Sequence, residues 1–171
     1  EPRTENRYVT IPRKIETWGS ISTNYNHKFA IDLNGTFNVF DESDRLTYGF
    51  DSRPRYRYSA KLLLTYFFSY IRKNNNKGYI DQVDGDDDES TPNDIIFANR
   101  NVITYSNTLG GKYAINSAMT INLAVRQYWS YADNKDILSL DPDGDLSPYP
   151  QYTDNKNSSF YSWNADLSYS W

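Results

Sequence analysis

The stretch YSWNADLSYSW, residues 161–171, shows the pattern that decides the fold. Its even positions carry only Ser, Asn and Asp, and its odd positions carry Tyr161, Trp163, Ala165, Leu167, Tyr169 and Trp171. Successive side chains of a β-strand point to opposite faces, so this alternation predicts a strand with one aromatic and one polar face. It also runs longer than the roughly five or six residues of an ordinary globular strand.

The same period of two recurs upstream of this stretch. It is clear over residues 29–39, 46–58 and 119–129, noisier over 62–71 and 95–113, and weak over 15–25. With residues 161–171 these segments predict seven strands in an all-β chain. We therefore expect one antiparallel, up-and-down β-barrel segment that occupies residues 1–171.

The segments between the expected strands alternate in length. Short polar joints are expected at residues 26–28, 59–61 and 115–117, and longer or acidic ones at 41–45, about 73–93 and 132–158. Short turns at one end, longer loops at the other and two-faced strands of about ten residues are typical of a transmembrane β-barrel. The odd faces would then contact lipid, and aromatic side chains at the strand ends would lie at the headgroup level.

A bacterial outer membrane is the location that this pattern predicts, with membrane lipid and other outer-membrane proteins as partners. A soluble β-sandwich or small barrel is the alternative, because its strands alternate as well. Such a sandwich favours aliphatic residues inward and turns every eight to twelve residues, whereas aromatic residues dominate here and two expected connections exceed about twenty residues.

Composition excludes several classes of protein. The net charge is −4, which argues against nucleic acid as a partner. The chain has no cysteine, which excludes disulfides and thiolate metal sites, and a single histidine. No stretch approaches the roughly 18 apolar residues of a membrane-spanning helix.

Several motifs are specific enough to compare with a family. They are Gly78-Tyr79-Ile80, Asn93-Asp94-Ile95-Ile96-Phe97, Asn99-Arg100, Arg126-Gln127-Tyr128-Trp129-Ser130, Asp143-Gly144-Asp145-Leu146 and Trp163-Asn164-Ala165-Asp166-Leu167-Ser168-Tyr169. Through them the chain resembles the C-terminal part of an uncharacterised domain-of-unknown-function family of bacterial outer-membrane β-barrels. In that family a carbohydrate-binding-family-9-like domain commonly precedes the barrel, which implies carbohydrate as a solute. Residues 1–60 resemble the family mainly in pattern, and Gln127 stands where its members usually carry His.

Cations on the expected inner face are the main candidates for function. Arg53, Arg55 and Arg57 share one strand face, and Arg126 and Asp166 are expected on the same wall. Three buried cations are costly without water or carboxylates, so we expect a solvated wall or pairing with Asp32, Asp51 or Asp166. Either a structural network or a passage for an anionic or sugar-like solute fits this arrangement.

Signals for enzymatic or cofactor chemistry are weak. Asp141, Asp143 and Asp145 offer oxygen ligands for calcium, but glycine comes one position too early for an EF-hand loop. The acidic run at residues 84–89 reads as a solvated loop. A dyad of His27 with Ser20 or Ser22 would make a membrane hydrolase, without a nucleophile motif to support it. We expect no enzyme activity and no cofactor.

The strand count bears on closure of the barrel. Bacterial single-chain barrels have an even number of strands, so seven strands predict a segment of a larger barrel. Members of the resembled family also continue past the position of Trp171 into another strand. If residues 8–13 formed a further strand, eight strands could close a small barrel with a filled interior. A transport or solute-handling barrel, a plugged structural or partner-binding barrel and a hydrolase remain the competing functions.

Overall fold

The computed structural model describes residues 7–83, 94–154 and 157–171. These residues form strands and turns without a helix, and so contain no helix able to cross a membrane. The strands are β1 (Lys14–Ser22), β2 (Phe29–Phe40), β3 (Leu46–Arg57), β4 (Leu62–Val83), β5 (Asp94–Ala114), β6 (Thr120–Leu140), β7 (Leu146–Pro148) and β8 (Ser158–Ser170).

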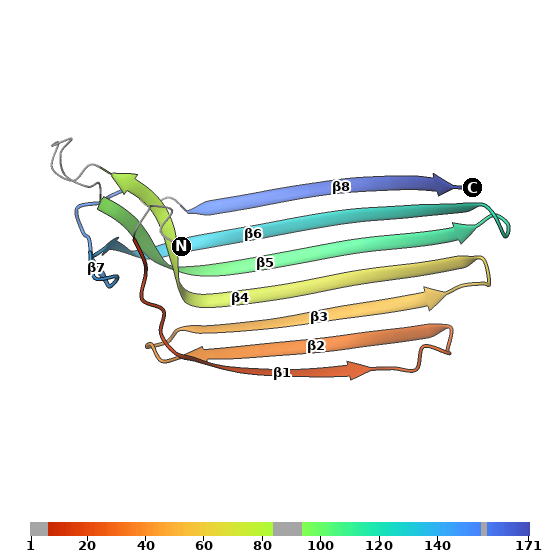
Figure 1. Ribbon diagram of the computed structural model, residues 1–171, viewed down its shortest axis with the longest axis horizontal. Helices are drawn as coiled ribbons and strands as arrows, with labels where there is room; N and C mark the ends of the chain where they lie inside the picture. The colour runs from red at the N-terminus through yellow and green to blue at the C-terminus, as the bar shows by residue number, and fades with distance from the viewer. Residues whose placement is uncertain (1–6, 84–93, 155–156) are drawn as a thin grey trace.

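The strands form one antiparallel sheet in the order of the chain. Each strand from β1 to β6 pairs with the next, and β6 pairs with β7 near one end and with β8 along the rest. Because β7 has only three residues, seven long strands make up an open half-barrel (Figure 1). In the described residues β1 pairs only with β2 and β8 only with β6, and these two edge strands run in the same direction.

The all-β antiparallel class and the short joints expected from the sequence are confirmed. Two strands are longer than expected: β4 continues to Val83 and β6 to Leu140. The loops expected at 73–93 and 132–158 are therefore wrong in their first parts, and residues 84–93 lie outside the described residues. The polar run through residues 74–77 reads as a loop, yet Asn74 pairs with β3, and Asn76 and Lys77 pair with β5, which the alternation of side chains does not reveal. Residues 7–13 form no strand, so the eight-strand alternative is also wrong.

Bulges interrupt the long strands at one level. The register shifts between Lys73 and Asn76 and between Tyr79 and Asp81 on β4, and at Asn99/Arg100 where β5 pairs with β6. A bulge adds a residue to one strand, bends it and moves the side chains that follow to the other face. The ends of β4 and β5 accordingly turn away from the other strands in Figure 1.

The bent strand ends carry a small core of their own. Its buried side chains are Ile95, Phe97, Leu138 and Leu140, against which Val9, Tyr79 and Leu146 pack. We call residues 7–13, 76–83, 94–101 and 133–148 the loop end. The rest of the sheet, which extends from the bulges to the short joints, is the long-strand sheet. The opposite end of the sheet, formed by the short joints, is the turn end.

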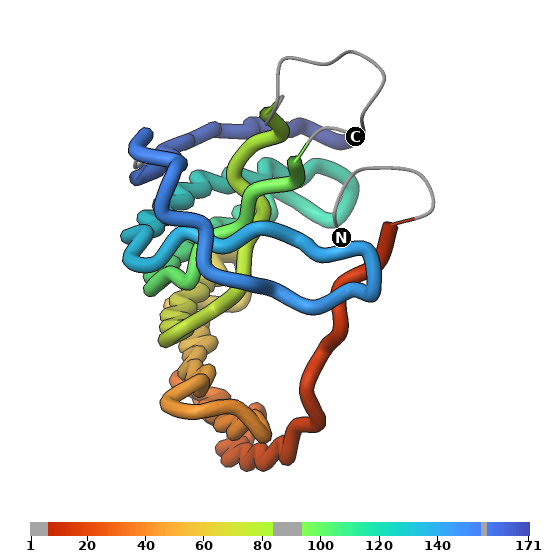
Figure 2. Tube along the Cα trace, turned by 90° about the vertical axis from the view of Figure 1, so that its left-hand side faces the viewer, coloured from red at the N-terminus to blue at the C-terminus, as the bar shows by residue number. Residues whose placement is uncertain are grey.

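Residues 7–13 cross the open side of the loop end (Figure 2). The Thr10 amide donates to the Gly144 carbonyl oxygen over 2.8 Å, and Arg7 Nη2 donates to the Leu140 carbonyl oxygen over 2.6 Å. At the other end of this segment, the Asp41 amide donates to the Arg13 carbonyl oxygen over 2.8 Å. The segment therefore connects the first strand to the loop-end core.

Candidate functional site

Register places one aromatic row across five neighbouring strands. Directly paired residues share a face of the sheet, so the pairings align Phe50, Tyr70, Tyr105, Trp129 and Tyr161. The ring centroids of Tyr70 and Tyr105 lie 5.1 Å apart and those of Tyr105 and Trp129 lie 5.5 Å apart. We call these five residues the aromatic row.

The face that carries the aromatic row is apolar across the long-strand sheet, and we call it the apolar face. Its side chains are open to the surroundings: Leu123 is 43% exposed, Leu109 52% and Leu167 74%. Soluble proteins rarely expose a contiguous apolar surface larger than a few hundred Å². Further members of this face are Ile15, Ile21, Ile31, Leu33, Phe37, Val39, Tyr48, Tyr56, Leu64, Phe68, Ile121, Val125, Trp163 and Tyr169.

Three of the polar side chains on the apolar face bond to one another. The Tyr66 hydroxyl donates to Asn107 Oδ1, and Asn107 Nδ2 donates to Gln127 Oε1. Polar groups on an apolar surface are costly to remove from water unless they are hydrogen-bonded, and this chain of bonds reduces that cost. The sequence pattern does not predict this chain of hydrogen bonds, because Asn107 and Gln127 become neighbours only through the register of β5 and β6.

The opposite, polar face carries the predicted arginines of β3. The Nε of Arg53 lies 3.4 Å from Asp51 Oδ1, and the Arg53 guanidinium lies 5.1 Å from the centre of the Phe67 ring. The Arg55 guanidinium lies 4.9 Å from the centre of the Tyr25 ring. The structure thus brings Asp51 to Arg53, as expected, and places Arg55 over an aromatic ring, where the attraction is a cation–π interaction.

Asp32 belongs to the same cluster. Its two carboxylate oxygens accept hydrogen bonds from the Ser22 and Tyr25 hydroxyls. Hydrogen bonding to the Asp32 carboxylate raises the pKa of Tyr25, which lies in the turn after β1, because loss of the phenol proton would break that bond. The hydroxyl of Ser22, a residue considered for a hydrolase dyad, is therefore engaged with Asp32.

Arg126 and Asp166 form another charged contact of the polar face. The guanidinium of Arg126 bonds to the Asp166 carboxylate and lies 3.4 Å from Asn164 Oδ1. Both partners are half-exposed or more, so the pair contributes little to stability by itself. Arg126 pairs with Asn164 and Leu123 with Leu167, which places the two pairs on opposite faces of the sheet.

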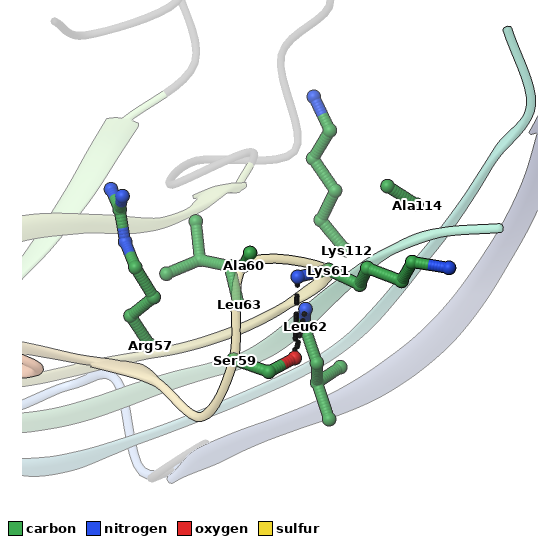
Figure 3. Close-up of a pocket in the computed structure, with 8 residues that line it drawn as sticks. All are labelled: Arg57, Ser59, Ala60, Lys61, Leu62, Leu63, Lys112 and Ala114. Atoms are coloured by element: carbon green, nitrogen blue, oxygen red, sulfur yellow. Dashed lines mark hydrogen bonds between the residues drawn. The ribbon is translucent and has the colours of Figure 1, made fainter. Parts of the chain in front are cut away.

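The polar face becomes basic at the turn end. Arg57 pairs with Leu63, and Leu63 pairs with Lys112, so two cations flank one leucine. With Lys61 they line a cavity of about 210 Å³ (Figure 3). The sequence pattern predicted Arg57 as a residue of the inner face but did not predict the two lysines. The absence of acidic residues from the three short joints was a signal that could have indicated a basic surface at this end.

The loop end carries a separate ionic cluster. Glu42 Oε2 lies 2.9 Å from Arg45 Nη1 and Glu42 Oε1 lies 3.0 Å from Lys77 Nζ. Partial burial opposes ionisation of Glu42, but the hydrogen bonds and charges of the two cations outweigh it and lower the pKa of Glu42. The cluster ties the β2–β3 loop to the extension of β4, a contact that the sequence pattern could not indicate.

The weak calcium candidates form a tight turn. The Gly144 amide donates to the Asp141 carbonyl oxygen, and the Ser147 hydroxyl donates to the Asp141 carboxylate. Within the described ranges no three acidic or histidine side chains gather into a group that could hold a metal ion, so Asp141, Asp143 and Asp145 do not make such a site. The acidic run at residues 84–89 lies outside the described residues.

Comparison with known proteins identifies a family. The family model described as Domain of unknown function (DUF5916) matches residues 1–171. No curated protein and no solved structure matches the chain. The family description assigns neither an activity nor a location.

Proposed function

The chain belongs to the DUF5916 family, and from that premise we propose that it is part of an integral outer-membrane β-barrel of a bacterium. In this proposal the apolar face contacts lipid and the polar face forms an inner wall for a polar or carbohydrate-like solute. Membrane lipid is the main partner, with other outer-membrane proteins as further ones.

The exposed, mainly apolar face of seven long strands carries this proposal. Hydrocarbon requires a spanning sheet to present apolar side chains outward and to satisfy its main-chain groups within the sheet. From Ile103 to Tyr113 the apolar face of β5 spans about 33 Å of strand, or about 25 Å of height at a tilt of roughly 40°, which matches the apolar band of such barrels. The aromatic row then corresponds to an interfacial girdle at the end toward the loops.

The polar face supports a solvated inner wall. Its charged contacts include Arg53 with Asp51 and Arg126 with Asp166, and their side chains are accessible. Charged groups on a lumen wall tune which solutes pass. Carbohydrate as the solute rests on the resemblance to proteins that carry a sugar-binding-like domain, and not on a sugar-shaped pocket.

Closure of the sheet into an antiparallel barrel restricts the number of additional strands. Because β1 and β8 run in the same direction, an antiparallel barrel closes only when an odd number of further strands joins them. A second copy of the chain, related by a twofold axis along the barrel, would place its β1 beside β8 in parallel, and so would not give an antiparallel barrel. We therefore propose that further strands of the same polypeptide complete the barrel.

A plugged, partner-binding barrel is the second candidate, and residues 7–13 favour it. This segment crosses the loop end and is held there by the bonds of Arg7 and Thr10. A segment fixed in that place would narrow the mouth of a barrel. Solute flux and partner binding would then depend on whether it stays docked.

Solute flux across liposomes tests the two candidates. The full-length protein is reconstituted into liposomes, and the swelling of the liposomes is measured with neutral sugars of increasing size. We expect swelling with small sugars. Absence of swelling in the native protein, together with swelling after Gly144→Ala has loosened residues 7–13, would favour the plugged barrel. No swelling in either case would contradict the transport proposal.

A further inference from the structure

We propose that the turn end of the polar face binds a phosphate-like dianion between Arg57, Lys61 and Lys112. This inference rests on the proposed function for its setting, because it names the ligand chemistry of the proposed inner wall. The site lies at the rim formed by the short joints, away from the loop-end core.

Two strands and a turn carry the three cations. Arg57 ends β3, Lys61 lies in the turn before β4, and Lys112 is near the end of β5. The strands of Arg57 and Lys112 are two strand spacings, about 10 Å, apart, a gap that these two long side chains can close around one anion. Figure 3 shows both side chains extending to the same side of the sheet, with Leu63 between them and Leu62 on the other side.

The turn itself is fixed before any ligand arrives. The Ser59 hydroxyl oxygen accepts hydrogen bonds from the amides of Lys61 and Leu62, over 3.2 Å and 3.1 Å. Lys61 Nζ donates to the Ile115 carbonyl oxygen over 3.0 Å, which holds the ammonium group at the rim and leaves two of its three protons for a ligand. The site is therefore partly preorganised.

Carboxylates that would neutralise these cations are absent from the surrounding sequence. Residues 23–28, 57–61 and 112–119 contain Lys28, Arg57, Lys61 and Lys112 but no Asp or Glu, although the chain as a whole has a net charge of −4. Among the described residues no ion pair involves Arg57, Lys61 or Lys112. The paired cations Arg45, Arg53 and Arg126 differ from them in this respect.

The geometry suits a tetrahedral oxyanion. An arginine fork donates two parallel hydrogen bonds to phosphate oxygens, and lysines act as point charges for the remaining ones. Two or three cations match the charge of a phosphate monoester better than that of a single carboxylate. A phosphorylated solute and the headgroup of phosphatidic acid both present a phosphate monoester, so both are sources of the ligand.

Binding of inorganic pyrophosphate to the full-length protein in neutral detergent tests the proposal. Isothermal titration compares the native protein with the R57Q/K112Q variant. The control is K14Q, which removes a cation from the polar face of β1 that is already paired with Glu16. We expect at least tenfold weaker binding in R57Q/K112Q, little change in K14Q and a loss of affinity with added salt. Equal affinity in all three proteins, or no binding in the native protein, would overturn the proposal.

A second arm distinguishes the sources of the phosphate. Association of the detergent-solubilised protein with vesicles of phosphatidylcholine alone is compared with vesicles that also contain phosphatidic acid. A preference for phosphatidic acid that R57Q/K112Q abolishes assigns the site to a lipid headgroup, whereas pyrophosphate binding without that preference assigns it to a soluble ligand. If the apolar face proves not to contact lipid while pyrophosphate still requires Arg57 and Lys112, the membrane proposal fails and the anion site stands.

Discussion

The loop end and the long-strand sheet use apolar side chains in opposite ways. In the loop end Ile95 is 1% exposed and Leu140 3%, whereas in the sheet Leu167 is 74% exposed and Ile15 75%. The loop end completes a core from its own residues. The sheet has no second layer over its apolar face in the described residues. The comparison teaches that one continuous set of strands carries a covered core at one end and an uncovered apolar face along the rest, and that the bulges mark the boundary.

Replacing Phe97 by alanine should give the largest effect. Phe97 is 3% exposed in the loop-end core, and truncation of a buried Phe leaves a cavity that costs about 3 to 5 kcal/mol. Phe37→Ala is the matched control, because Phe37 is 47% exposed on the apolar face and surrounding detergent can fill the space. Urea unfolding in detergent measures both. Equal losses would mean that the two regions do not differ in how they are covered.

Arginine at Leu167 should cost about 2 to 4 kcal/mol in a bilayer if the residue lies near the midplane. Ser168→Arg is the control, since the neighbouring residue of β8 points to the polar face. Unfolding of the protein from lipid vesicles gives both free energies. A loss for Ser168→Arg that equals or exceeds that for Leu167→Arg would reverse the proposed assignment of the faces.

Gly144→Ala should loosen the loop end without affecting the sheet. Gly144 has φ = 94°, and a Cβ there would lie 2.5 Å from Cε2 of Tyr8, so the turn is strained by roughly 1 to 3 kcal/mol and residues 7–13 are displaced. The amide of Thr10, which bonds to the Gly144 carbonyl oxygen, should then exchange faster with deuterium. Gly19→Ala is the control, because no atom lies within 4 Å of its added Cβ. Unchanged exchange at Thr10 would show that this contact does not hold the segment.

Acid should weaken the tie between the β2–β3 loop and the loop end by a small amount. The folded-state pKa of Glu42 is below its unfolded-state value, so its contribution is complete above the unfolded pKa and is lost as the pH falls through the folded pKa. We expect the stability difference between the native protein and Glu42→Gln to shrink as the pH falls below the usual glutamate range. A difference that is constant between pH 7 and pH 3 would contradict this role.

The sequence predicted the parts of the fold that side-chain alternation controls. Residues 29–39, 46–58 and 161–171 alternate cleanly, and their strands and faces agree with the structure. The extensions of β4 and β6 were missed, because bulges shift the faces and because polar residues such as Asn76 and Lys77 still pair through their main chain.

The candidate site was predicted in the same uneven way. Arg53, Arg55 and Arg57 were visible as one face of a strand. Arg57 and Lys112 are aligned through Leu63, and Tyr70 is aligned with Tyr105 and Trp129. Both alignments depend on the register between strands, which places together residues that are distant in sequence. Register is set by turns and bulges together, so single-strand patterns do not contain it.

Lipid contact of the apolar face is the central claim, and single cysteines along β6 test it most directly. These 171 residues contain no cysteine, so each introduced thiol is the only one among them, and any cysteine elsewhere in the full-length protein is first replaced by serine. Residues 121–129 of the reconstituted full-length protein are replaced one at a time, and a spin label on each reports collision with oxygen and with a water-soluble nickel complex. We predict that labels at odd positions such as Leu123 collide mainly with oxygen and that labels at even positions such as Ala124 collide mainly with nickel. Equal access of the nickel complex at odd and even positions would contradict the claim.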